Sequence, residues 1–200
     1  MKKPKTSYHH GDLAESLLNA VDELATKFGL EAVTLRSCAK RVGVSPSSAF
    51  RHYADKRTLL TAFATRALMQ LSTVLASANK AALHKDQDAF LAVSLAYIKF
   101  AIEKPAFFRA MWREETIYTT DDAYMEAIIV LTSTIKGGFA SSLVDDDASS
   151  MSSAELLAWS SVHGLANLLI DGPVGNGLSK AQKTSLATDM LELLQPALEA

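Results

Sequence analysis

Hydroxyl and basic side chains gather between residues 34 and 56, and this combination of donors suits contacts with a polyanion. Hydroxyl groups, amines and the N–H groups of helix N-termini satisfy phosphate oxygens, whereas a guanidinium pairs bidentately with guanine. The candidates for contact with base edges are Ser47, Ser48 and Arg51. Because only Arg51 offers the bidentate geometry, we expect it to determine sequence preference.

A second group of residues has side chains of the kinds that hydrolases use, but their spacing does not suit a catalytic site. A nucleophile, a base and an orienting carboxylate are available in Ser160, Ser161, His163 and Asp171. These residues fall within one helical segment, and no G-x-S-x-G elbow accompanies them. The sequence therefore predicts no catalytic site, and a hydrolase is a remote alternative.

The remaining reactive side chains predict neither a metal site nor a cofactor. His9 and His10 have no third ligand at a suitable spacing. The single cysteine, Cys38, has no partner for a disulfide, which fits a reducing compartment, and its neighbours favour a place in the core. No apolar stretch of about 18 residues and no signal peptide is evident, so we expect a cytoplasmic protein without a membrane segment.

The elements that must position these residues are predicted to be helices. Apolar residues recur three and four positions apart, and Gly and Pro fall between the periodic segments, which indicates an all-α fold. The first helix is expected over 11–28, ended by Gly29 in the left-handed conformation. Its apolar face consists of Leu13, Leu17, Val21, Leu24 and Phe28.

Two short helices follow, and their capping residues can be identified. Thr34 and Gly43 are placed to cap a helix over 35–42. Ser45 is placed to cap a helix over 46–53, with Pro46 at its first position. We expect Phe50 to hold this last helix against the first one. Two short helices joined by a tight turn are typical of a helix-turn-helix.

Longer segments make up the rest of the chain, to a total of about nine helices. Asp55 is expected to cap the first of them, and Pro105 to separate the second from the third. Ser152 or Ser153 is expected to cap the fifth. The predicted segments are 55–81, 86–103, 105–115, 120–143, 153–171 and 179–197.

Charge is distributed unevenly along the chain. Residues 1–57 hold ten Lys and Arg against six Asp and Glu, whereas residues 58–200 hold ten against sixteen. A basic N-terminal part on an acidic body is expected when one end of a molecule meets phosphate. We therefore place a DNA-binding domain at 1–57 and a second domain at 58–200.

The segment "TLRSCAKRVGVSPSSAFRHYADKRTLL" resembles the DNA-binding segment of the tetracycline-repressor (TetR) family. The matching features are an aromatic-x-His-aromatic step, a lysine and paired leucines, and the likeness covers residues 8–60. It implies phosphate contacts by Thr34, Ser45, His52, Tyr53 and Lys56, to which we add Arg36 and Pro46. For Tyr53, a place as a wedge in the core is an equal alternative.

The C-terminal part is similar to a domain type of this family with a Trp-x-x-x-His-Gly signature, here Trp159, His163 and Gly164. The resemblance implies an apolar cavity for a small organic effector. Gly164 is expected to permit close approach of helices. The candidate lining residues are Tyr97, Phe100, Phe107, Phe108, Met111, Trp112, Tyr118, Met125, Trp159 and His163.

The last two helices carry more leucine than a single small bundle needs, and in the family such helices form a dimer. A two-fold dimer would hold two recognition helices about 34–36 Å apart, the spacing of a palindromic site. We therefore expect a homodimeric repressor that an effector releases from its DNA operator. A constitutive DNA-binding regulator without an effector is the alternative.

Overall fold

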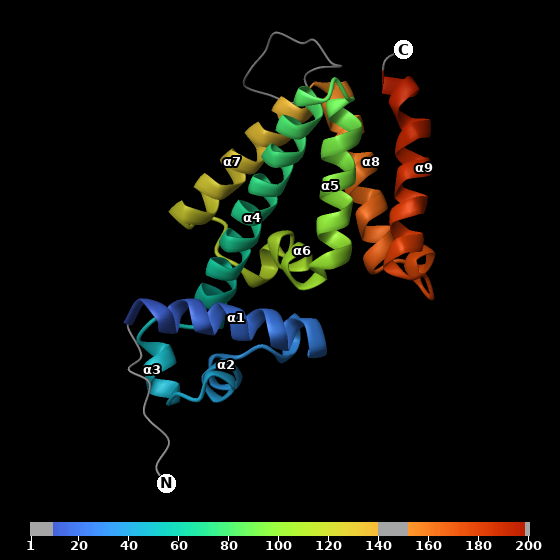
Figure 1. The fold of residues 1–200 in the computed structure, drawn as a ribbon. Helices are drawn as coiled ribbons and strands as arrows, with labels where there is room; N and C mark the ends of the chain where they lie inside the picture. Colours follow the sequence, from blue (N-terminus) through green and yellow to red (C-terminus); the bar gives the residue numbers. More distant parts are fainter. Residues whose placement is uncertain (1–9, 140–151, 199–200) are drawn as a thin grey trace.

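The computed structural model describes residues 10–139 and 152–198, and every regular element in these ranges is helical (Figure 1). The predicted all-α class is therefore confirmed. The predicted end of the segment over 120–143 lies outside the described residues, as does His9.

Helix α1 spans His10–Phe28 and buries most of the predicted apolar face. Leu17 and Val21 are fully buried, but Phe28 is 59% exposed because it sits in the last turn, where the chain leaves the core. Gly29 ends the helix at φ 83° and ψ 161°, a conformation outside the predicted left-handed helical region. It leads into a short 3-10 turn, η1, over Leu30–Ala32.

Helix α2 spans Leu35–Val42, with the predicted ends. The Thr34 hydroxyl accepts a hydrogen bond from the Ser37 N–H, the Ser37 hydroxyl accepts one from the Thr34 N–H, and Gly43 is left-handed. Cys38 is fully buried, as predicted, and burial raises the pKa of its thiol to about 11.

Helix α3 spans Pro46–Phe50 and is shorter than the predicted 46–53. Ser45 caps it by accepting a hydrogen bond from the Ser48 N–H, and Pro46 occupies the first turn, as predicted. Ala49 is the buried residue of this helix. Since successive helical residues point about 100° apart, Phe50 faces outward and is 46% exposed, so its predicted place in the core is wrong.

Helix α4 spans Lys56–His84 and connects the N-terminal helices to the rest of the chain. The Asp55 carboxylate caps it by accepting a hydrogen bond from the Thr58 N–H at 2.7 Å, as predicted. Helix α4 is long and apolar enough to cross a membrane, but 56% of its most apolar 18-residue stretch is buried inside the protein. A core helix of this kind is weak evidence for a membrane span.

The C-terminal helices follow the predicted order with shifted ends. Pro105 opens α6, as predicted, and Ser152 and Glu155 form a capping box at the start of α8. The predicted helix over 105–115 ends early, at Met111, and continues as the 3-10 turn η2 over Glu114–Thr116. The remaining elements are α5 Ala89–Glu103, α6 Pro105–Met111, α7 Asp122–Phe139, α8 Ser153–Ile170, η3 Pro173–Gly175 and α9 Lys180–Leu198.

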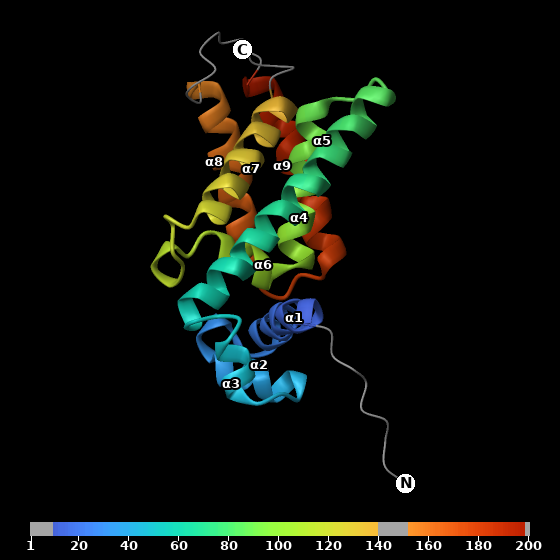
Figure 2. The ribbon, with the colours of Figure 1, turned by 90° about the vertical axis from the view of Figure 1, so that its left-hand side faces the viewer.

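The helices form an upright bundle over a smaller N-terminal group. Helix α4 packs against α5, α6 and α7, and α5 packs against α8 and α9 (Figures 1 and 2). Helix α1 lies across the lower ends of α4 and α6 and contacts both. Apolar core residues continue from α1 through α4 into the bundle. The boundary at residue 57 that we expect between the domains would fall in the first turn of α4.

Candidate nucleic-acid interface and effector site

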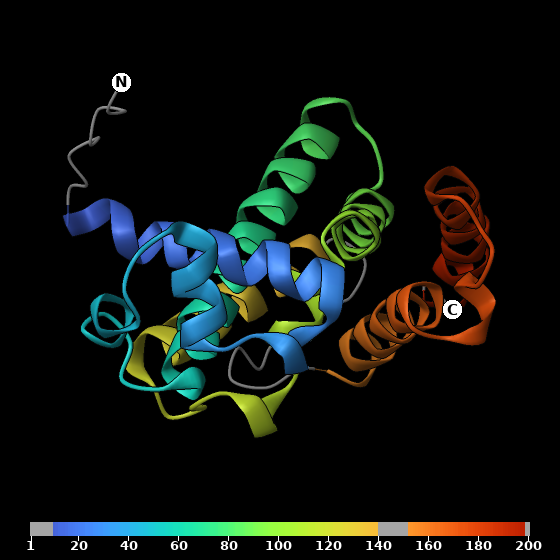
Figure 3. The ribbon, with the colours of Figure 1, turned by 90° about the horizontal axis from the view of Figure 1, so that it is seen from below.

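Helices α2 and α3 lie on the side of α1 that faces away from the bundle (Figures 1 and 3). Most of the predicted DNA-binding side chains are exposed on this end of the molecule. The exposed residues are Thr34, Arg36, Ser45, Pro46, Ser47 and Arg51, and the half-buried ones are Ser48 and His52. Eight of the ten predicted residues are therefore accessible on or beside α2 and α3, and we call these eight residues the α2–α3 surface.

Local hydrogen bonds organise the start of α3. The Ser45 hydroxyl lies 2.9 Å from the Ser47 hydroxyl and 2.8 Å from the Ser48 hydroxyl. Arg51 is the C-cap residue of α3, one turn beyond these serines, and its side chain is exposed. The arrangement presents hydroxyl groups at the helix N-terminus and a guanidinium at its other end, and both kinds of donor suit DNA.

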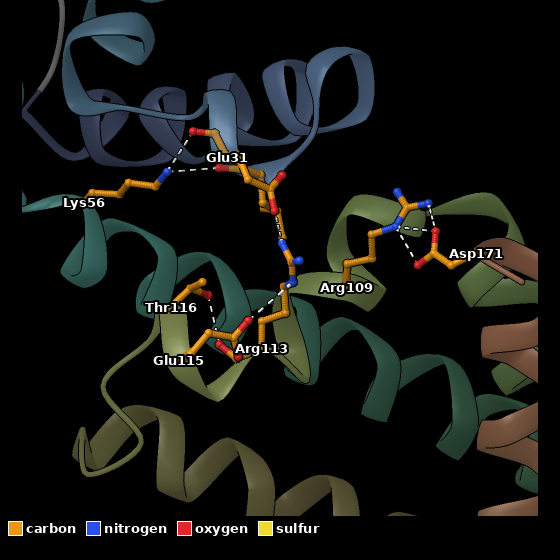
Figure 4. Close-up of polar contacts among 8 residues, drawn as sticks. Glu31, Lys56, Arg109, Arg113, Glu115, Thr116 and Asp171 are labelled. Atoms are coloured by element: carbon orange, nitrogen blue, oxygen red, sulfur yellow. Dashed lines mark hydrogen bonds and ion pairs between the residues drawn. The ribbon is translucent and has the colours of Figure 1, made fainter.

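Two of the predicted phosphate donors, Tyr53 and Lys56, form bonds within the protein. Tyr53 is 8% exposed, its hydroxyl donates to the carbonyl of Ala14 at 3.5 Å, and burial raises the pKa of its phenol. The Lys56 ammonium donates to the carbonyls of Leu30 at 3.2 Å and Glu31 at 3.0 Å (Figure 4). Tyr53 thus lies as a wedge in the core, and Lys56 ties α4 to η1.

His163 lies among aromatic rings in the C-terminal bundle. The Tyr97 hydroxyl lies 2.8 Å from His163 Nδ1. The imidazole stacks on Phe108 at 5.4 Å between ring centroids and meets the ring of Trp112 edge-on at 5.1 Å. The Trp159 ring lies 6.2 Å from the imidazole. We call these five residues the His163 cluster.

Burial determines the ionisation of the His163 cluster. It lowers the pKa of His163 and raises that of Tyr97, which favours a neutral imidazole beside a protonated phenol. The phenol donates to Nδ1 in one tautomer of the neutral imidazole and accepts from Nδ1–H in the other, so either tautomer satisfies both groups. The cluster is therefore a polar point inside an apolar bundle, where it can orient a polar group of a ligand.

The other predicted lining residues divide into buried and exposed ones. Phe100, Phe107 and Met111 are nearly or fully buried, and Phe107 stacks between Phe63 and Phe100 at 4.6 and 6.5 Å. Tyr118 and Met125 are 39% and 46% exposed, so the structure does not place them in an interior cavity. Tyr118 lies outside the regular helices, between η2 and α7, and Met125 lies in the first turn of α7 with its side chain exposed.

Tyr118 instead joins the two parts of the molecule. Its hydroxyl donates to the Asp55 carboxylate at 2.9 Å, its N–H donates to the Thr61 hydroxyl at 2.9 Å, and its ring lies 4.5 Å from the Arg57 guanidinium. The hydrogen bond from the Thr58 N–H and that from Tyr118 lower the pKa of Asp55. These contacts fix the start of α4 against the segment after α6.

The residues considered for hydrolysis do not assemble into a triad. The Ser160 and Ser161 hydroxyls both donate to the Leu157 carbonyl, at 3.0 and 2.7 Å. The Asp171 carboxylate accepts hydrogen bonds from Arg109 rather than from His163. Within the described parts of the chain, no three His, Cys, Asp or Glu side chains are grouped as metal ligands would be.

A cavity of about 420 Å³ lies between η1, α6 and the end of α8. Phe108 and Trp112 are the predicted lining residues that border it. Charged residues that the sequence did not single out for this role form its rim, namely Glu31, Arg109, Arg113 and Asp171 (Figure 4). Their partners lie 62 to 82 residues away along the chain, so no local pattern in the sequence could indicate them.

Comparison with known proteins is consistent with this arrangement. Residues 17–63 match the bacterial regulatory proteins of the tetR family, and residues 90–194 match the tetracyclin repressor-like C-terminal domain. An uncharacterized HTH-type transcriptional regulator, YobS of Bacillus subtilis (strain 168), is 26% identical over 126 residues. That alignment covers 62% of this chain and 65%, less than two thirds, of the relative.

Solved structures share the fold over nearly the whole chain. A protein with unknown function from Rhodococcus sp. RHA1 is 25% identical, with a TM-score of 0.69 over 93% of this chain and 96% of that one. The TetR family transcriptional regulator PfmR from Thermus thermophilus is 15% identical, with a TM-score of 0.59 over 94% and 96%. The helix-turn-helix and the helical bundle define a DNA-binding transcriptional regulator. The chain belongs to the TetR family.

Proposed function

We propose that this regulator is a homodimeric repressor that binds a palindromic operator through the α2–α3 surface and is released by a small organic effector. The observation that carries the proposal is the exposure of the predicted DNA-binding residues on one end of the molecule, beyond α1. In this arrangement Arg51 contacts a base, and the hydroxyl groups and helix N-termini position the protein on phosphates.

Exposed apolar residues on α8 and α9 support dimerisation through these helices. They are Leu156, Leu157, Leu168, Met190 and Leu193, of which Leu193 is 75% exposed. A Cβ atom added to Gly164 would meet nothing within 4 Å, so the close helix approach expected there is not made within the chain. The second copy of a two-fold dimer would cover this face, and burial of its apolar area would drive association.

Release of DNA follows from two states of the dimer. The effector binds preferentially to a state in which the distance between the α2–α3 surfaces no longer matches the half-sites. The effector therefore lowers operator affinity through a coupling free energy, without touching DNA. The His163 cluster supports an effector site, because it combines aromatic rings with one hydrogen-bonded polar pair.

The replacement Arg51→Ala tests the DNA-binding surface. With an operator selected from random DNA, we expect a loss of about 5- to 150-fold in affinity, the value of one bidentate contact, together with relaxed preference at one base pair. Gel-shift titration measures both. Lys80→Ala, an exposed cation on α4, is the matched control and should leave affinity unchanged. Equal affinity of Arg51→Ala and the control would contradict the assignment.

A constitutive DNA-binding regulator is the second candidate function. It is favoured by the close contacts among the aromatic rings, since Phe63, Phe100 and Phe107 pack on one another and are nearly or fully buried. Screening small organic molecules for an effect on operator affinity separates the two candidates. If none alters affinity, the induction part of the proposal fails and DNA binding stands.

A further inference from the structure

The cavity between η1, α6 and α8 has the size of a ligand site and two arginines in its wall. Its volume of about 420 Å³ lies within the range of small-molecule sites. Arg109 in α6 and Arg113, which precedes η2, border the same space (Figure 4). A guanidinium offers a planar fork of N–H donors that matches a carboxylate.

Each arginine already holds a carboxylate from another element. Arg109 donates from Nε to both carboxylate oxygens of Asp171, at 2.9 Å each. Arg113 donates to the Glu31 carboxylate in η1, and its Nε lies 3.6 Å from Glu115. The bond with Arg113 lowers the pKa of Glu31 and raises that of Arg113. The cavity is thus arranged to bind carboxylates.

The internal carboxylates are more exposed than the arginines that hold them. Side-chain exposure is 72% for Glu31 against 40% for Arg113, and 47% for Asp171 against 34% for Arg109. Ion pairs at such exposure contribute little to stability, because water solvates the released charge. Either carboxylate can therefore turn into solvent and leave its arginine to an incoming anion.

Aromatic rings supply the apolar part of the cavity. Trp112 lines it and is half-buried, whereas Phe108 is 1% exposed and lies behind the Trp112 ring, with 6.4 Å between the ring centroids. Both rings also contact His163, and the Asn167 amide, another lining group, donates to the His163 carbonyl at 3.0 Å. Occupation of the cavity therefore acts directly on the His163 cluster.

We propose that this cavity binds a small aromatic carboxylate, which packs its ring against Trp112 and displaces Glu31 or Asp171 from the arginines. This inference rests on the proposed function, because it names the chemical class of the effector. Arg113 joins the bundle to Glu31, and Lys56 joins α4 to the same turn. Displacement of Glu31 removes one of these links between the bundle and the DNA-binding helices.

Calorimetric titration of the full-length protein tests the site with a defined set of probes. The probes are benzoate and naphthalene-2-carboxylate, each paired with its neutral carboxamide. We expect at least one carboxylate to bind about tenfold or more tightly than its carboxamide, because only the anion gains charge-assisted hydrogen bonds. If neither carboxylate binds, or if carboxylate and carboxamide bind equally, the proposal is overturned.

Substitutions with opposite expected effects locate the binding. Arg109→Gln and Arg113→Gln should each lower carboxylate affinity by about tenfold. Glu31→Gln and Asp171→Asn should raise it, by up to about fivefold, because they remove a competitor of similar strength to an exposed ion pair. Arg41→Gln breaks an exposed pair with Glu23 outside the cavity and should change nothing. Uniform effects of all five variants would contradict the site.

Operator affinity separates this inference from the proposed function. The probe that binds more tightly, naphthalene-2-carboxylate or benzoate, is added at saturating concentration. It should weaken operator binding by the wild type and by Arg41→Gln. It should not weaken operator binding by Arg113→Gln. Probe binding with unchanged operator affinity would overturn the effector role of the site. Absence of any selected operator, with probe binding intact, would instead refute the proposed function alone.

Discussion

Tyr53 shows how one side chain can satisfy a sequence pattern for another reason. It occupies the last position of the aromatic-x-His-aromatic step, where resemblance implied a phosphate contact. In the structure its ring is buried and its hydroxyl reaches a carbonyl of α1. The Tyr53 side chain thus serves packing. In the aromatic-x-His-aromatic step, the half-buried His52 remains available to DNA.

Removal of the Tyr53 hydroxyl should therefore have little effect. For Tyr53→Phe we expect a loss of less than about 1 kcal/mol in the free energy of unfolding, because the hydrogen bond is long at 3.5 Å. Operator affinity should be unchanged. Urea unfolding and gel-shift titration measure the two quantities. A clear drop in operator affinity with unchanged stability would show that the hydroxyl serves DNA.

His163 should make stability depend on pH. Burial lowers its pKa in the folded protein below the ordinary 6.5, so the unfolded chain binds more protons over that interval. The contribution of His163 is fully present above pH 6.5 and is lost as pH falls toward the lower folded value. The free energy of unfolding should therefore fall more in the wild type than in His163→Gln between about pH 7.5 and about pH 5.5. Equal slopes would contradict this.

Residues with a local role could be predicted from the sequence, and residues with a long-range role could not. Thr34, Ser45 and Asp55 cap helices as predicted, because a cap is determined by the next few residues. Phe50 was misplaced, since a five-residue helix is too short for its pattern to fix the inward face.

At the scale of elements, the turn after α8 is fixed by close backbone packing. η3 folds back on the last turn of α8, and a Cβ atom added to Gly175 would lie 1.9 Å from the Leu169 carbonyl oxygen. Only glycine fits without displacing backbone atoms. This turn therefore determines how α9 starts alongside the bundle, and α9 is one of the two helices of the proposed dimer interface.

Gly175→Ala should accordingly destabilise the protein by about 1–3 kcal/mol or more, as overpacking does. The matched control is Gly137→Ala in α7, where an added Cβ meets nothing within 4 Å. It should be neutral or stabilising by up to about 1 kcal/mol, because alanine favours helices over glycine. Thermal unfolding of both variants measures the difference. Similar losses in the two variants would contradict the close packing at η3.

The helices themselves could be predicted because their signals are local. Apolar periodicity, caps and Pro105 gave the order of the elements, but the predicted helix over 105–115 merged α6 with η2. No breaker stands between Met111 and Glu114, and the end of α6 is instead set by its contacts with α1 and α4. Tertiary packing thus sets the C-terminal end of α6, which the local sequence does not determine.

At the scale of the whole molecule, the bundle and the DNA-binding helices meet through contacts between distant parts of the sequence. Arg113 pairs with Glu31, Arg57 donates to the Ile117 carbonyl at 2.7 Å, and Tyr118 donates to Asp55. No periodicity connects these residues, so their pairing could not be predicted. They provide the physical links through which a change in the bundle would reach the α2–α3 surface.

Selection of double-stranded DNA from a random pool tests the central claim most directly, namely that a two-fold dimer recognises DNA through α2 and α3. We expect an inverted repeat whose half-site centres are separated by one helical turn, about 10 base pairs, or a multiple of it. We also expect Leu193→Asp, which places a charge at an exposed apolar position of α9, to abolish both dimerisation and DNA binding. Enrichment of no sequence, or of a single site without a repeat, would contradict the account.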